Sequence, residues 1–155
     1  MVISRQDQTL SLKDGTQTVK CSDRLEIGEF SAPGPGEYDV AGISAIVLPG
    51  LSSLATVVSD GGLSILYLDR PVTLNKESDD LANIDVLVTR VNSASELKDA
   101  QKVAKDLEPS GWALFGTLTH DEIAKELTLN GDSQEKWTVT ASSLPEEGME
   151  IIDLA

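Results

Sequence analysis

Residues 84–115 read IDVLVTRVNSASELKDAQKVAKDLEPSGWALF, and the spacing of apolar residues changes within this stretch from that of a strand to that of a helix and back. Residues 84–91 are strongly β-branched, which predicts a strand. Ser93 and Glu96 have the spacing of a capping box, which predicts a helix start. Apolar residues then line one face of that helix before Pro109 ends it: Leu97, Ala100, Ala104 and Leu107. A short apolar strand follows over residues 112–115, and the apolar stripe of the helix is expected to cover a sheet.

The chain before residue 84 is dominated by predicted strands. Residues 8–20 are predicted to form a hairpin, because Leu10 and Leu12 alternate with polar residues and Asp14-Gly15 favours a turn. Further strands are expected over residues 25–30, 43–48, 54–58 and 63–68. The last of these is almost continuously apolar, which indicates burial on both faces. Residues 75–80 are polar and are predicted to be a loop or a short helical turn.

The chain after residue 115 alternates between helix and strand. Thr119 and Glu122 form a second capping box, which predicts a short helix before Asn130-Gly131. Strands are expected over residues 137–140 and 149–154. Neither a G-x-G-x-x-G motif after the first strand nor a phosphate-binding loop motif is present, which argues against a nucleotide-binding domain. We therefore expect one α/β domain over residues 1–155, built as a layered β-sheet sandwich with flanking helices.

Composition restricts the classes of partner. With 155 residues, 40% of them hydrophobic and 25% charged, the chain is long enough to bury its own core. No apolar run approaches the 18 or so residues of a membrane span, and residues 1–6 turn polar at once, so we expect neither a membrane partner nor a secretion signal, and a cytoplasmic location. The formal net charge of −14 opposes binding to a phosphate backbone, so no nucleic acid partner is expected.

A glycine- and proline-rich turn precedes the strand at residue 43. Its motif consists of Gly34, Pro35, Gly36, Glu37 and Tyr38. Proline lacks a backbone donor and glycine is loosely restrained, so this segment is expected to be a structured turn. We expect Glu37 to fix the turn by accepting backbone donors, and the Tyr38 ring by packing below it.

The ten residues from Gly34 to Ile43, GPGEYDVAGI, resemble the G-P-G-E-Y-E-V-x-G-[IV] signature of the metallo-β-lactamase-fold hydrolases related to ascorbate-6-phosphate lactonase. Residues 81–87, Ala100 with residues 107–109, and the LPEEG loop at residues 144–148 match other segments of that family in the same order. The similarity covers nearly the whole chain. It implies a truncated metallo-β-lactamase fold.

The chain departs from this family at the metal ligands. The family carries H-x-H-x-D-H after its early strands, whereas the segment before Gly34 is too short for that loop and contains no histidine. Where the family has G-D-x-x-H, this chain reads LDRP over residues 68–71, so only Asp69, which matches a metal-bridging aspartate, is retained. Where the family places a further metal-binding histidine, residues 113–117 are largely apolar.

The remaining residues do not supply a catalytic zinc site, which normally needs three protein ligands. His120 and Cys21 are the only imidazole and thiol, and we interpret them as a surface histidine and a buried apolar residue. No D-x-D-x-D-G loop or G-x-S-x-G elbow is present. We interpret the adjacent acidic pairs as solvated surface: Asp79-Asp80, Asp121-Glu122 and Glu146-Glu147. We therefore predict no catalytic residue, no metal site and no cofactor, and retain Asp69 and His120 as the only candidate site residues.

Three functions follow as hypotheses, and the chain is expected to lack enzymatic activity under the first and third. The first is a catalytically silent metallo-β-lactamase-fold domain, a pseudoenzyme retained for protein or ligand binding. The second is a metal-dependent hydrolase with a rearranged site around Asp69 or His120. The third is a structural subunit that forms homo-oligomers along open sheet edges. Trp112 and Trp137 are predicted to be core residues rather than partner contacts.

Overall fold

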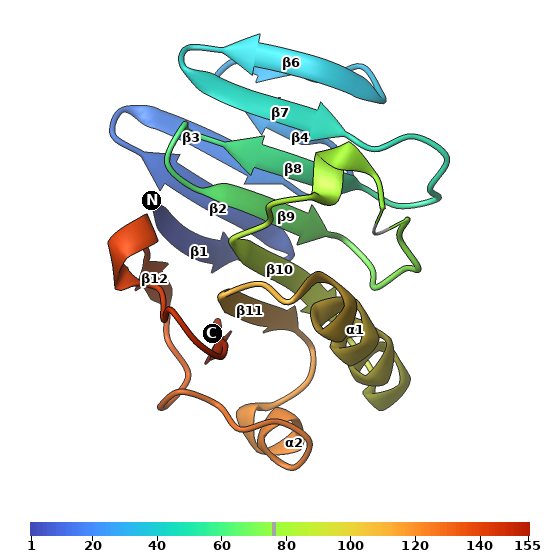
Figure 1. Ribbon diagram of the computed structural model, residues 1–155, viewed down its shortest axis with the longest axis vertical. Coiled ribbons are helices and arrows are strands. Elements are labelled where there is room, and N and C mark those ends of the chain that lie inside the picture. The colour runs from blue at the N-terminus through green and yellow to red at the C-terminus, as the bar shows by residue number, and fades with distance from the viewer. Residues whose placement is uncertain (76) are drawn as a thin grey trace.

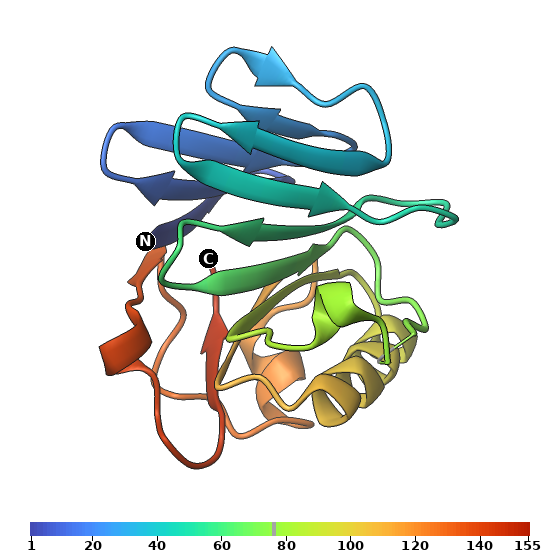
Figure 2. The ribbon, with the colours of Figure 1, turned by 45° about the horizontal axis from the view of Figure 1, so that its top comes forward.

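The computed structural model describes residues 1–75 and 77–155, which form two β-sheets packed face to face and a layer of helices (Figure 1). This arrangement confirms the predicted layered α/β sandwich. Figures 1 and 2 show α1 on one side of the seven-stranded sheet, with the six-stranded sheet on the other side. No helix in the described part of the chain is long and apolar enough to span a bilayer.

The six-stranded sheet has the order β12-β1-β2-β3-β4-β5, and all of its neighbouring strands are antiparallel. Its strands are β1 (Val2–Gln6), β2 (Thr9–Asp14), β3 (Gln17–Cys21), β4 (Leu25–Ile27), β5 (Phe30–Ser31) and β12 (Lys136–Thr138). The predicted hairpin is present as β2 and β3. Asp14 pairs with Gln17, so Gly15 and Thr16 form a two-residue loop in which Gly15 has a φ of 56°. Glycine adopts this left-handed conformation without strain.

The seven-stranded sheet has the order β13-β11-β10-β9-β8-β7-β6. Its strands are β6 (Gly36–Val40), β7 (Ile43–Val47), β8 (Ala55–Ser59), β9 (Ser64–Leu68), β10 (Val86–Val91), β11 (Gly111–Gly116) and β13 (Glu150–Asp153). Strands β6 to β9 form an antiparallel meander. Strands β9, β10, β11 and β13 are parallel, so their carboxyl ends lie along one edge of the sheet.

Two α-helices follow the strands β10 and β11. Helix α1 (Ala94–Leu107) begins after Ser93, whose side chain accepts a hydrogen bond from the Glu96 backbone N–H. The Glu96 carboxylate accepts from the N–H of Asn92 rather than of Ser93, so the predicted capping box is only half formed. Both reciprocal bonds of the second predicted box, Thr119 with Glu122, are present at α2 (His120–Ala124).

Two short 3₁₀-helices complete the elements, η1 (Asp79–Leu81) and η2 (Ala141–Ser143). Helix η1 agrees with the helical turn predicted within residues 75–80, of which Lys76 lies outside the described residues. Helix η2 was not predicted, because its serines and alanine carry no periodic apolar signal.

Two apolar clusters lie on the two faces of the seven-stranded sheet. One fills the space between the sheets and contains Trp137, which is 6% exposed. The other lies beneath α1 and contains Trp112, whose indole N–H donates to the Thr89 hydroxyl at 3.0 Å. Both tryptophans are therefore core residues, as predicted. Burial of an aromatic side chain of this kind contributes about 1.5–3 kcal/mol.

Candidate functional site

The carboxyl ends of the parallel strands carry the polar groups from which a site is built in sheets of this type. Asp69 directly follows β9, and Arg90 is the second-to-last residue of β10. Thr89 pairs with Leu68 in the parallel register, which places Arg90 beside Asp69 although the two residues lie 21 positions apart in the chain. Further along the same sheet, His120 is the first residue of α2, which follows β11, and Asp153 is the last residue of β13.

The Asp69 carboxylate is held in an ion pair. Its Oδ1 atom lies 2.9 Å from a terminal nitrogen (NH2) of Arg90, and the two side chains are only 14% and 18% exposed. The same Oδ1 atom accepts a hydrogen bond of 3.0 Å from the Tyr67 hydroxyl. Burial, and then the neighbouring Asp69 carboxylate, raises the pKa of Tyr67 above its ordinary value, so this hydroxyl stays protonated and acts as a donor.

Arg90 uses three of its nitrogen atoms in contacts within the chain. Besides the ion pair, Nε donates to the backbone carbonyl of Asp69 at 3.1 Å, and the other terminal nitrogen donates to the Gln8 side-chain oxygen at 3.3 Å. Gln8 lies in the turn between β1 and β2, so Arg90 joins the two sheets at this edge. A planar guanidinium suits such divergent contacts better than an ammonium group.

A second arginine covers the aromatic side chains beside this ion pair. The guanidinium carbon of Arg5 lies 6.0 Å from the ring centre of Phe115, and that ring stacks on Tyr67 with centroids 6.3 Å apart. Arg5 also donates to the backbone carbonyls of Asp7 and Gly116. The carboxyl ends of β9 and β10 are thus covered by two arginines, a tyrosine and a phenylalanine: Arg5, Arg90, Tyr67 and Phe115. Sequence reasoning did not select Arg5 or Arg90, although Arg90 is the one charged residue in β10.

His120 is paired with a different carboxylate. Its Nδ1 atom lies 2.9 Å from Oδ2 of Asp153, the last residue of β13. The His120 side chain is 32% exposed, whereas the Asp153 side chain is 7% exposed. Within residues 1–75 and 77–155, no hydrogen bond or ion pair links this pair to Asp69. The structure therefore places the two candidate residues in separate pairs.

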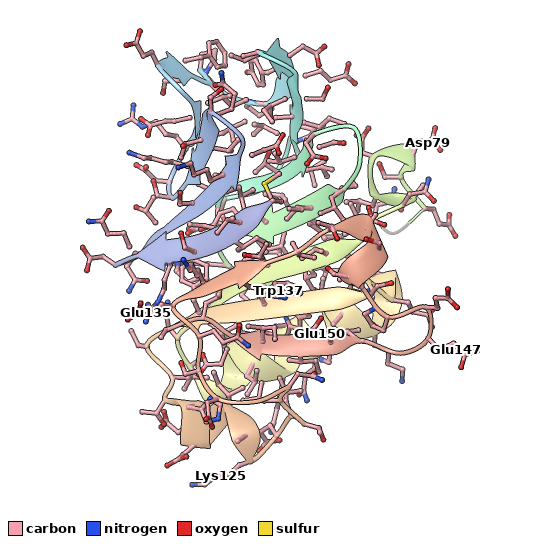
Figure 3. All side chains as sticks on the ribbon, turned by 90° about the vertical axis from the view of Figure 1, so that its left-hand side faces the viewer. Asp79, Lys125, Glu135, Trp137, Glu147 and Glu150 are labelled. Atoms are coloured by element: carbon pink, nitrogen blue, oxygen red, sulfur yellow. The ribbon has the colours of Figure 1, made fainter. Side chains whose placement is uncertain are left out.

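The donor set does not fit a catalytic zinc ion. Cys21 is buried in the core, and burial raises the pKa of its thiol, so a thiolate ligand is disfavoured. Among the described residues, no three His, Cys, Asp or Glu side chains are grouped so as to hold a metal ion. Figure 3 shows the labelled acids Asp79 and Glu147 projecting outward from the ribbon, in keeping with a solvated acidic surface.

The turn motif is held mainly by its tyrosine. The Tyr38 hydroxyl donates to the Gly34 carbonyl at 2.5 Å, and its ring lies 5.4 Å from that of Phe30. Glu37 is exposed on β6, and no hydrogen bond to its carboxylate occurs in the described structure. Pro33, Gly34 and Pro35 line one wall of a hollow of about 260 Å³.

Comparisons with known proteins bear on the fold. No protein-family model matches the chain, and no curated protein matches it. A crystal structure from Thermotoga maritima, assigned to the Zn-dependent hydrolases of the metallo-β-lactamase superfamily, superposes with a TM-score of 0.69 and 14% identity, and the match covers 100% of both chains. A variant of the β-hydroxylase CmlA matches 52% of this chain and 24% of its own, at 13% identity and a TM-score of 0.42, from which nothing is inferred.

The protein therefore has a metallo-β-lactamase-like fold in a shortened form, as the sequence predicted. At 14% identity the likeness concerns the fold alone. The closer relation to ascorbate-6-phosphate lactonase stays a prediction.

Proposed function

We propose that this protein is a catalytically silent domain of metallo-β-lactamase-like fold, retained for binding another protein or a small ligand. One observation carries the proposal: the single imidazole of the chain is paired with Asp153, and neither it nor the buried Cys21 thiol contacts Asp69. Hydrolysis by a transition metal needs such ligands to converge on one point.

Among the hollows of the described surface, two are lined by several aliphatic side chains and suit a binding partner. One lies between residues 71–74 and α1, with a volume of about 360 Å³, and has Val72, Leu74 and Val103 among its lining residues. The other is the hollow beneath the turn motif, where Leu48, Leu51 and Leu54 face the prolines. Apolar walls with a few polar groups are typical of small-ligand sites. Neither hollow includes Asp69, Arg90 or His120.

The two outer strands of the seven-stranded sheet give little support to the alternative of a homo-oligomer. The edge of β13 is covered by the chain, since Gln134 and Asn130 bond to its backbone. The outer edge of β6 carries Glu37 and Asp39. Pairing of this edge with its copy would bring like charges together, which is how natural proteins discourage such contacts.

The rearranged hydrolase remains the other alternative, and one experiment separates the two. Untagged protein is analysed for zinc, manganese and iron, and is assayed on β-lactam, lactone and phosphodiester substrates. We expect no stoichiometric metal, and no hydrolysis that Asp69→Ala or His120→Ala abolishes. Asp79→Ala, an exposed carboxylate, is the matched control. Stoichiometric metal together with hydrolysis that depends on Asp69 or His120 would overturn the proposal.

Binding is tested separately in the hollow beneath the turn motif. A fragment library is screened by chemical shifts of the backbone amides, with Leu51→Asp as the variant and Leu118→Asp as a control at a distant, partly buried leucine. We expect fragments that shift the amides of residues 47–54 and lose binding in Leu51→Asp only. Fragments that bind equally to all three proteins would exclude this hollow as the site.

A further inference from the structure

We infer that the Arg90 guanidinium supplies, from within the chain, the positive charge that a metal ion supplies to the corresponding aspartate in metal-dependent members of this fold. The inference deepens the proposed function and rests on it, because it explains how a metal-bridging position persists without the other ligands. It starts from the mostly buried ion pair between Asp69 and Arg90, at a position that the sequence resemblance predicts to match a metal-bridging aspartate.

The backbone places Asp69 at the carboxyl end of a parallel strand. The Asp69 N–H donates to the Leu54 carbonyl at 2.9 Å, which extends the pairing of β9 with β8 by one residue. The side chain therefore leaves the sheet at the carboxyl end of β9, where parallel strands present their site residues. With 14% of its side chain exposed, the Asp69 carboxylate is largely removed from water.

A carboxylate in this setting needs a nearby positive charge, because transfer from water disfavours the unpaired anion. Arg90 meets this need with a direct contact of 2.9 Å between its terminal nitrogen and Oδ1. The position of Arg90 is fixed by strand register, by its bond to the Asp69 carbonyl and by its bond to Gln8. The cation is thus held by several independent contacts.

The same contacts disfavour a metal ion at Oδ1 of Asp69. A cation approaching Oδ1 would meet the guanidinium at contact distance and would be repelled by it. The hydroxyl of Tyr67 occupies a further acceptor site of the same oxygen. The ion pair and the Tyr67 hydrogen bond therefore compete directly with metal ligation through Oδ1.

A double-mutant cycle tests the inference. Arg90→Met removes the charge and keeps much of the volume, and Asp69→Asn removes the opposite charge and keeps the shape. We expect Arg90→Met to lower the Tm by about 5–10 °C, since it leaves an uncompensated carboxylate, and the double variant to recover part of that loss. Arg24→Met is the matched control, because Arg24 is 62% exposed and lies 3.9 Å from its partner Asp23; its Tm should be unchanged.

Two further measurements, on an Arg90→Lys variant and on zinc binding, make the outcome of the cycle decisive. Arg90→Lys retains the charge without the planar fork and should fall between wild type and Arg90→Met. If Arg90→Met does not fold, recovery of folding in the Asp69→Asn background supports the inference, and failure in both backgrounds overturns it. Strictly additive Tm changes would also overturn it. Zinc binding by equilibrium dialysis should be the same in wild type and Asp69→Asn, and the loss of one zinc equivalent in Asp69→Asn would contradict the inference.

The failures are distinguishable from those of the proposed function. Additive Tm changes in a metal-free, inactive protein would refute the inference and leave the proposed function standing. Metal-dependent hydrolysis centred on His120, with strong coupling between Asp69 and Arg90, would refute the proposed function and leave the ion-pair inference standing.

Discussion

Two carboxylates at the carboxyl ends of parallel strands, Asp69 after β9 and Asp153 in β13, are paired with different kinds of side chain. Asp69 is paired with Arg90, which also contacts a backbone carbonyl and the neighbouring sheet. Asp153 is paired with His120 through one contact, on a short helix. Both partners of the first pair are mostly buried, whereas the His120 side chain of the second is 32% exposed. The first pair is therefore held more firmly than the second.

Truncation of each carboxylate gives the largest expected difference between the two pairs. Asp69→Ala leaves the poorly exposed Arg90 charge without its counter-ion and is expected to cost about 2–4 kcal/mol in the free energy of unfolding. Asp153→Ala is expected to cost less, about 1–2 kcal/mol, because it removes a single contact to a side chain that is 32% exposed and that water can reach. Urea unfolding of both variants measures this order, and a larger loss for Asp153→Ala would reverse the comparison.

Tyr67→Phe tests how much the tyrosine hydroxyl contributes to the pair of Asp69 with Arg90. The change removes the hydrogen bond of 3.0 Å to Asp69 and keeps the ring that stacks on Phe115. We expect a loss of about 1 kcal/mol, the net value of one hydrogen bond, while the ion pair persists. Tyr38→Phe, which removes the bond to Gly34 at a distant turn, serves as the matched control in the same unfolding assay. If Tyr67→Phe also abolished the coupling between Asp69 and Arg90, the hydroxyl rather than the cation would be the main partner.

Asp60 adds a carboxylate held by backbone amides, for which the smallest effect is expected. Burial opposes ionisation of Asp60, but hydrogen bonds from the N–H groups of Leu63 and Gly62 outweigh it and lower the pKa. A lowered pKa in the folded state means that this contribution is present above the ordinary aspartate range and is lost as the pH falls through the folded value. Asp60→Ala should therefore cost about 0.5–1 kcal/mol at neutral pH and little in acid, as measured by unfolding across pH. An equal loss at both pH values would contradict this assignment.

The strands of the seven-stranded sheet were largely predictable, because the β-branched run of residues 84–91 and the almost continuously apolar run of residues 63–68 mark buried strands. Strand β6 was not predicted as a strand. Its residues Glu37 and Asp39 place charges at an exposed edge, so the segment lacks the apolar alternation on which prediction depends. The half-formed cap at α1 was also beyond prediction, since the spacing of Ser93 and Glu96 does not specify which N–H the carboxylate accepts.

Only half of each pair at the site could be chosen from the sequence. Asp69 and His120 were selected by resemblance and by chemical type, whereas their partners Arg90 and Asp153 were not. The pairing of Asp69 with Arg90 depends on the parallel register of β9 and β10, which no local pattern encodes. A lone charge near the carboxyl end of a buried strand, as in β10, is the signal that would have pointed to Arg90.

The most direct test of the pairing between Asp69 and Arg90 is a crystal structure of the protein grown with excess zinc, with data collected at the zinc absorption edge. We expect no anomalous peak at Asp69 and a guanidinium of Arg90 within hydrogen-bond distance of Oδ1. A zinc ion bound to Asp69, with Arg90 displaced from it, would show that a metal rather than Arg90 is the natural partner of this carboxylate.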